Sequence, residues 1–132
     1  MPITYQIDRA RGVIQTRCIG AATFHEVIEH FRALHADPEV TERLSVLLDL
    51  TELASVPERD QLRAIAGEVK DMRDRVQWNA LSIVAPSDLL FGMSRVFGIF
   101  AEGHFAHTGV FRTRAEAERW LDARLTHQTG VA

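Results

Sequence analysis

Histidine and glutamate side chains, which can bind a metal ion together, are concentrated in the segment 25–30. Two ligands on one face of a helix need a spacing of four residues, which places them about 40° apart. His25 and His30 are five residues apart, or about 140° around a helix, so they would not share a metal ion. We expect instead that His25 pairs with Glu29, and Glu26 with His30, on a helix face in contact with solvent.

A second group of possible ligands, Glu102, His104 and His107, surrounds a turn, with no fourth ligand nearby in the sequence. We interpret it as a polar loop, with a metal site as the alternative. The single cysteine, Cys18, ends a strand-like run without a neighbouring base, which favours a packed thiol over a nucleophile. We therefore expect no catalytic residues, no metal and no cofactor.

Polar residues also lie at or after the ends of two buried runs: Asp49 and Thr51 at the first, Ser82 and Ser87 at the second. The carboxyl ends of neighbouring parallel strands form a common binding crevice, so these four residues are candidate ligands of a small molecule. The alternative, which we favour for Asp49, is a hydrogen bond from its carboxylate to the backbone of the following turn. No glycine-rich loop that could hold a nucleotide phosphate follows any of the strands.

A Ser or Thr followed three residues later by Glu occurs at 23–26, 55–58 and 113–116. In such a capping box the hydroxyl and the carboxylate satisfy amide donors that the first helical turn leaves free. Each of the three segments follows a strand-like run and precedes a helical pattern. The three segments therefore predict three helix starts and divide the chain into alternating strands and helices.

The resulting order is ββαβαβαβα in one α/β domain. Strands are predicted at 3–7, 13–19, 44–50, 78–85 and 107–111, and helices at 23–36, 57–73, 87–101 and from 113 onward. The runs 44–50 and 78–85 are almost continuously apolar, which is typical of strands buried on both faces of a parallel sheet. We expect a mixed, mainly parallel sheet with four helices packed on it, a domain over residues 1–125 and a frayed tail at 126–132.

The composition excludes several classes of protein. The 132 residues carry a formal net charge of −3 without a basic cluster, so nucleic acid is not an expected partner. No apolar run is long enough for a membrane span, and the N-terminus lacks the pattern of a secretory signal. A single cysteine suits a reducing compartment, so we expect a cytoplasmic protein.

The third predicted helix is apolar over a wider arc than one side of a sheet can cover. Its apolar residues span about 180°, whereas a helix on a sheet needs a stripe of about 100° or somewhat more. We name Leu90, Phe91, Arg95, Phe97 and Ile99 as the interaction or ligand face. The excess surface would contact the first helix, a second copy of the chain or a small apolar ligand, and of the last two we favour the second copy.

Two segments resemble the STAS domain, the family of anti-sigma-factor antagonists and of sulfate-transporter cytoplasmic domains. Residues 47–53, Leu-Leu-Asp-Leu-Thr-Glu-Leu, are similar to the buried strand of that family, and a helix begins shortly after it, near Ser55. Residues 110–121 resemble the last strand and helix of the branch named after stage II sporulation protein AA. The resemblance covers about residues 3–125 and implies a STAS-like fold of bacterial type.

In that family a phosphorylatable Ser begins the second helix, and this chain has Pro57, Glu58, Arg59 and Asp60 at the matching place. Ser55 is the nearest hydroxyl, either as a helix cap or as a displaced phosphoacceptor. The resemblance implies a non-enzymatic regulatory or protein-interaction module, acting as a homodimer or with a regulatory protein partner. The alternative is a carrier or sensor of a small apolar or lipid-like ligand held under the third helix.

Overall fold

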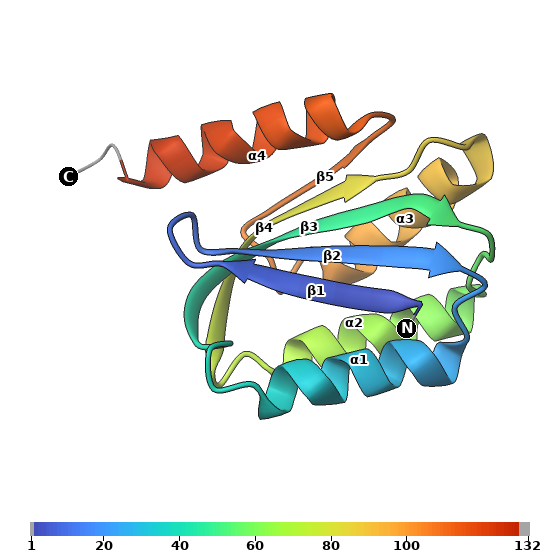
Figure 1. Ribbon diagram of the computed structural model, residues 1–132, viewed down its shortest axis with the longest axis horizontal. Helices are drawn as coiled ribbons and strands as arrows, with labels where there is room; N and C mark the ends of the chain where they lie inside the picture. Colours follow the sequence, from blue (N-terminus) through green and yellow to red (C-terminus); the bar gives the residue numbers. More distant parts are fainter. Residues whose placement is uncertain (1, 130–132) are drawn as a thin grey trace.

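The computed structural model describes residues 2–129. Strands and helices follow one another in the predicted order ββαβαβαβα (Figure 1). The strands are β1 (Ile3–Asp8), β2 (Val13–Gly20), β3 (Glu42–Leu53), β4 (Val76–Val84) and β5 (His107–Phe111). The helices are α1 (Phe24–Ala36), α2 (Arg59–Asp71), α3 (Asp88–Ala101) and α4 (Arg114–Thr129).

The strands form one sheet in the order β1-β2-β3-β4-β5. Strands β1 and β2 are an antiparallel hairpin whose turn includes Gly12 at a φ of 65°, where glycine avoids a steric clash. The pairs β2/β3, β3/β4 and β4/β5 are parallel and are joined by helical crossovers. Both runs predicted to lie inside the sheet do so, since β3 and β4 each have a strand on either side.

The helices divide unequally between the two faces of the sheet. Figure 1 shows α4 on one side and α1 and α2 on the other, and α3 packs beside α2. Neighbouring residues of a strand point to opposite faces, so Ile14 joins the core under α1, α2 and α3, while Val13 joins the core under α4. The core under α4 is small and closed: Val13, Leu47, Ala80, Val84, Ala117 and Leu121.

Two of the three predicted caps begin a helix, and one prediction was wrong. The Thr23 hydroxyl accepts a hydrogen bond from the Glu26 amide, and the Glu26 carboxylate accepts one from the Thr23 amide. The Thr113 hydroxyl likewise accepts a hydrogen bond from the Glu116 amide at the start of α4, but here the Glu116 carboxylate accepts from the Thr113 hydroxyl. Ser55 does not cap α2, because its hydroxyl donates to the carbonyl oxygen of Ala22.

Helix α2 begins four residues after Ser55, with Glu58 as its N-cap residue. The Gln61 side chain accepts a hydrogen bond from the Glu58 amide at 2.9 Å. The residue before a proline avoids helical backbone angles, so Pro57 keeps the segment before it extended. The helix therefore starts later than the sequence pattern indicated.

The last helix, α4, extends to Thr129, so its final turn occupies the beginning of the predicted tail at 126–132. Residues 130–132 lie outside the described part of the chain. In the described part, no helix combines the length and apolar character that crossing a membrane requires.

Candidate functional site

A cavity of about 320 Å³ lies between the sheet and the three helices α1, α2 and α3. Its sheet wall includes Ile14 of β2, Leu48 of β3 and Ile83 of β4. Its helix walls include Phe31 of α1, Leu62 and Ile65 of α2, and Leu90, Met93 and Phe97 of α3. Protein interiors are normally packed without voids of this size, so the cavity is the outstanding feature of this face.

The cavity reaches the carboxyl ends of β2 and β3. The segments after these two strands, which contain Thr23 and Val56, line it, and the Val56 side chain is exposed at 37%. The Ser55 hydroxyl donates to the Ala22 carbonyl oxygen at 3.2 Å, and the Ala54 amide donates to the Gly20 carbonyl oxygen at 2.8 Å. These bonds tie the two segments together, so the entrance has a fixed rim at the edge where α/β sheets usually bind ligands.

The wall of the cavity carries no Asp, Glu, Lys or Arg among its described residues. It is built mostly from aliphatic and aromatic side chains. The polar exceptions are Thr16, Cys18, Thr23, His30, Ser55, Gln61 and Ser94. An uncharged wall of this composition suits an apolar ligand, because it offers no partner for a buried ion.

His30 points into the cavity, so the predicted pair of Glu26 and His30 on a solvated face is wrong. The His30 ring packs edge-on against the rings of Tyr5 and Phe31, with centroid distances of 5.6 and 5.5 Å. Burial lowers the pKa of His30 to about 4, so the imidazole is neutral at pH 7. The other predicted pair is present, with His25 Nε2 at 4.0 Å from the Glu29 carboxylate.

Cys18 also lines the cavity. Burial, together with the negative charge of Asp49, raises the pKa of the Cys18 thiol to about 11. The thiol is therefore protonated at neutral pH, and a protonated thiol is a poor nucleophile.

The predicted face of α3 is divided between two surfaces. Leu90 and Phe97 line the cavity. Phe91, Arg95 and Ile99 line a separate groove between α3 and β5, with a volume of about 400 Å³. The Ile99 side chain is 67% exposed there. The wide apolar arc of α3 therefore serves an internal cavity on one side and an open groove on the other.

The four residues of the predicted crevice do not form one site. Asp49 and Ser82 point to the α4 face of the sheet, away from the cavity. The Asp49 carboxylate accepts from the Thr51 amide at 2.9 Å, as favoured from the sequence, and from Arg114 at 3.0 Å. Ser82 donates to a carbonyl oxygen of α4, and Ser87 caps α3.

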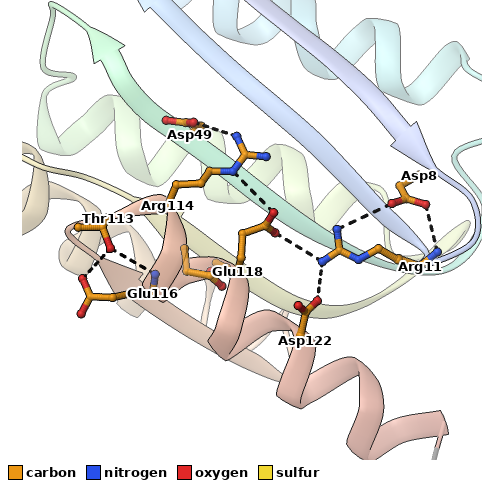
Figure 2. A network of polar contacts seen from close by, with 10 residues as sticks. Asp8, Arg11, Asp49, Thr113, Arg114, Glu116, Glu118 and Asp122 are labelled. Carbon is orange, nitrogen blue, oxygen red and sulfur yellow. Dashed lines mark hydrogen bonds and ion pairs between the residues drawn. The ribbon is translucent and has the colours of Figure 1, made fainter.

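Asp49 belongs to a network of ion pairs that fastens α4 to the sheet (Figure 2). Arg114 also contacts Glu118, which in turn contacts Arg11 in the turn of the hairpin. Burial opposes the charge of Asp49, but hydrogen bonds from Thr51 and Arg114 outweigh it and lower the pKa of this carboxyl. The carboxylates of Asp49 and Glu118 are thus paired with arginines that join α4 to the sheet and the hairpin turn.

The remaining predicted residues lie at the surface. Glu58 and Asp60 are exposed at the start of α2, where an acidic side chain is favoured by the helix dipole. Ser55 lies apart from them, at the rim of the cavity. Within residues 2–125, no group of three or more His, Cys, Asp or Glu side chains is arranged to hold a metal ion.

Thr16, His30 and Ser94 were not predicted as cavity residues, although the positions of Thr16 and His30 carry a signal. Thr16 alternates with Ile14 and Cys18, and so shares their face of β2. His30 lies about 40° from the apolar Leu34 around α1, at the flank of the buried stripe.

No protein-family model matches the chain, and no curated protein matches it either. Among solved structures, it is similar to an uncharacterised protein of the DUF3478 family from Shewanella loihica PV-4, described as having a SpoIIAA-like fold. The similarity has a TM-score of 0.58 at 20% sequence identity, and it covers 90% of this chain and 93% of the other. The structural comparison thus agrees with the resemblance in the sequence: the chain has a SpoIIAA-like fold.

Proposed function

We propose that this protein binds a small apolar molecule in the cavity between the sheet and helices α1 to α3, as a carrier or sensor without catalysis. The observation that supports this most directly is the cavity itself, with about 320 Å³ of space behind an uncharged wall. Small-molecule sites typically have volumes of about 300–1,000 Å³ and mainly apolar linings with a few polar groups. The cavity meets these criteria.

The two faces of the sheet differ in packing: the core under α4 is filled by its own side chains, whereas the other face keeps a cavity of about 320 Å³. Both lie against the same sheet, and both are lined by aliphatic side chains. An unfilled apolar cavity lowers stability, because its lining loses dispersion contacts. An apolar occupant would restore these contacts, so binding would stabilise the folded state.

The fluorescence of a tryptophan in the cavity wall can report such binding. Trp78 lines the cavity, whereas the other tryptophan, Trp120, packs against Phe111 beneath α4. In a Trp120→Phe background, titration with 1-octanol should change the fluorescence of Trp78 in a saturable manner. Native mass spectrometry of protein purified under mild conditions should show an additional bound mass.

A pair of variants separates cavity binding from surface adsorption. Val46→Phe places a larger side chain in the cavity and should abolish the saturable signal. Leu89→Phe adds the same ring at an exposed position of α3, outside the cavity, and should leave the signal intact. Absence of saturable binding in the parent protein, or equal binding by both variants, would contradict the proposal.

A regulatory or protein-interaction module is the second function that we propose, and the groove between α3 and β5 supports it. Phe91, Arg95 and Ile99 form an open, partly apolar surface beside an edge strand. The Arg112 guanidinium lies 4.2 Å from the centre of the Phe91 ring, which holds this surface in shape. We expect the groove to form a homodimer that Phe91→Asp converts into a monomer, as measured by light scattering. A parent protein that is monomeric at high micromolar concentration would exclude this dimer.

A further inference from the structure

Two hydroxyl-bearing residues line the cavity, and the described protein offers neither side chain a hydrogen-bond partner. Thr16 on β2 is 4% exposed and Ser94 on α3 is 5% exposed, and neither side chain makes a hydrogen bond to another described residue. Neither hydroxyl oxygen is sealed off from the cavity, so each can hydrogen-bond to a molecule that fills it. A ligand that carries a hydrogen-bonding atom would find a partner there.

The Thr16 hydroxyl has a second polar group close to it. Thr16 lies directly opposite Tyr5 in the β1/β2 ladder, and residues in this position have Cβ atoms about 4.5–5.5 Å apart. The His30 ring packs against the Tyr5 ring with a centroid distance of 5.6 Å. Both Thr16 and His30 line the cavity, and both neighbour Tyr5.

The Tyr5 hydroxyl already has a hydrogen-bond partner. This hydroxyl donates to the Asp37 carboxylate at 2.7 Å, so Tyr5 positions His30 without competing for a ligand. The His30 nitrogens make no hydrogen bond to the described residues. A neutral imidazole offers one donor and one acceptor, and a threonine hydroxyl can act as either.

We propose, on the basis of the function proposed above, that the ligand is an uncharged apolar molecule with a hydroxyl or carbonyl oxygen bound between Thr16 and His30. A hydroxyl can donate to one of these groups and accept from the other, and a carbonyl oxygen can accept from both. A carboxylate would be buried beside a wall without a cation, which is strongly unfavourable. A pure hydrocarbon would leave both protein groups unpaired.

The test compares ligands that share one chain length and differ at the polar end: 1-octanol, 2-octanone, octanoate and octane. Affinities are measured at pH 8 through Trp78 fluorescence in the Trp120→Phe background. We expect 1-octanol and 2-octanone to bind at least about tenfold more tightly than octanoate, because the carboxylate loses its hydration without compensation. Equal or tighter binding of octanoate would overturn the inference.

Variants at Thr16 and His30 test whether the oxygen atom of the ligand binds between these two residues. Thr16→Val keeps the shape of the side chain and removes the hydroxyl, and it should weaken 1-octanol about five- to tenfold, the typical effect of one hydrogen bond. The binding of octane should not change. Thr16→Ser should restore the affinity for 1-octanol, and His30→Phe should lower it. Leu89→Phe, at an exposed position of α3 outside the cavity, is the control and should retain the preference.

The outcomes distinguish this inference from the proposed function. If octane and 1-octanol bind, but Thr16→Val and His30→Phe leave the affinity for 1-octanol unchanged, the ligand oxygen does not bind between Thr16 and His30. The cavity then remains a binding site. If none of the four compounds binds, the proposed function fails together with the inference.

Discussion

At the scale of a single residue, burial beside the cavity changes the acidity of His30. Its pKa is lowered from 6.5 to about 4 because burial disfavours the charged imidazolium. The unfolded chain therefore binds a proton at a higher pH than the folded protein. The resulting contribution to stability is present above pH 6.5 and is lost as the pH falls toward 4.

This difference predicts a pH dependence that His30→Phe should remove. Between pH 7 and pH 5 the parent protein should lose about 2 kcal/mol of its unfolding free energy to this group, at 1.36 kcal/mol for each pKa unit. Urea unfolding of both proteins at the two pH values measures the effect. If the two free energies fall in parallel between pH 7 and pH 5, His30 is not buried as described.

Gly109 gives a second prediction at this scale, on the other face of the sheet. A Cβ atom at this position would lie 2.8 Å from the Phe111 ring and 3.1 Å from the Trp120 ring. Gly109→Ala should therefore displace both rings and destabilise the protein by about 1–3 kcal/mol. The matched control is Gly92→Ala in α3, where an added Cβ meets nothing within 4 Å. It should raise stability by a few tenths of a kcal/mol or more, because alanine is the better helix former.

Single elements could be predicted well from the sequence, because their signals are local. The threonine caps at Thr23 and Thr113 and the apolar runs inside β3 and β4 each depend on a few neighbouring residues. Ser55 failed as a cap because its hydroxyl bonds to Ala22, which is distant in the sequence. The cavity could not be predicted, because periodicity tells which side of a helix is apolar and not how much space lies beneath it.

The corrected start of α2 leads to a prediction about the caps. Thr23→Ala removes a complete capping box and should cost about 1 kcal/mol. Glu58→Ala should lower the stability of α2 by less, because the Gln61 side chain still accepts from the backbone amide of residue 58. Thermal unfolding followed by circular dichroism gives both values. A greater loss in Glu58→Ala than in Thr23→Ala would contradict this order.

In the molecule as a whole, the sheet separates a closed core under α4 from an open one under α1, α2 and α3. The ion pairs of Asp49, Arg114 and Glu118 hold α4 against the closed side (Figure 2). The open side keeps a cavity whose entrance is fixed by the bond between Ser55 and Ala22. The cavity side also holds the larger of the two hydrophobic cores, so a ligand there would bind within the main core of the protein.

If the cavity exists to bind a ligand, stability and binding should respond to Val46→Phe in opposite directions. The added ring occupies space that is empty in the free protein, so it should raise the unfolding free energy by about 1 kcal/mol, or the melting temperature by about 4 °C. Saturating 1-octanol should raise the melting temperature of the parent protein and leave that of Val46→Phe unchanged. If the cavity is only a packing defect, Val46→Phe should still stabilise the protein, but 1-octanol should not change the melting temperature of the parent protein. Differential scanning calorimetry of both proteins, with and without 1-octanol, distinguishes the two cases.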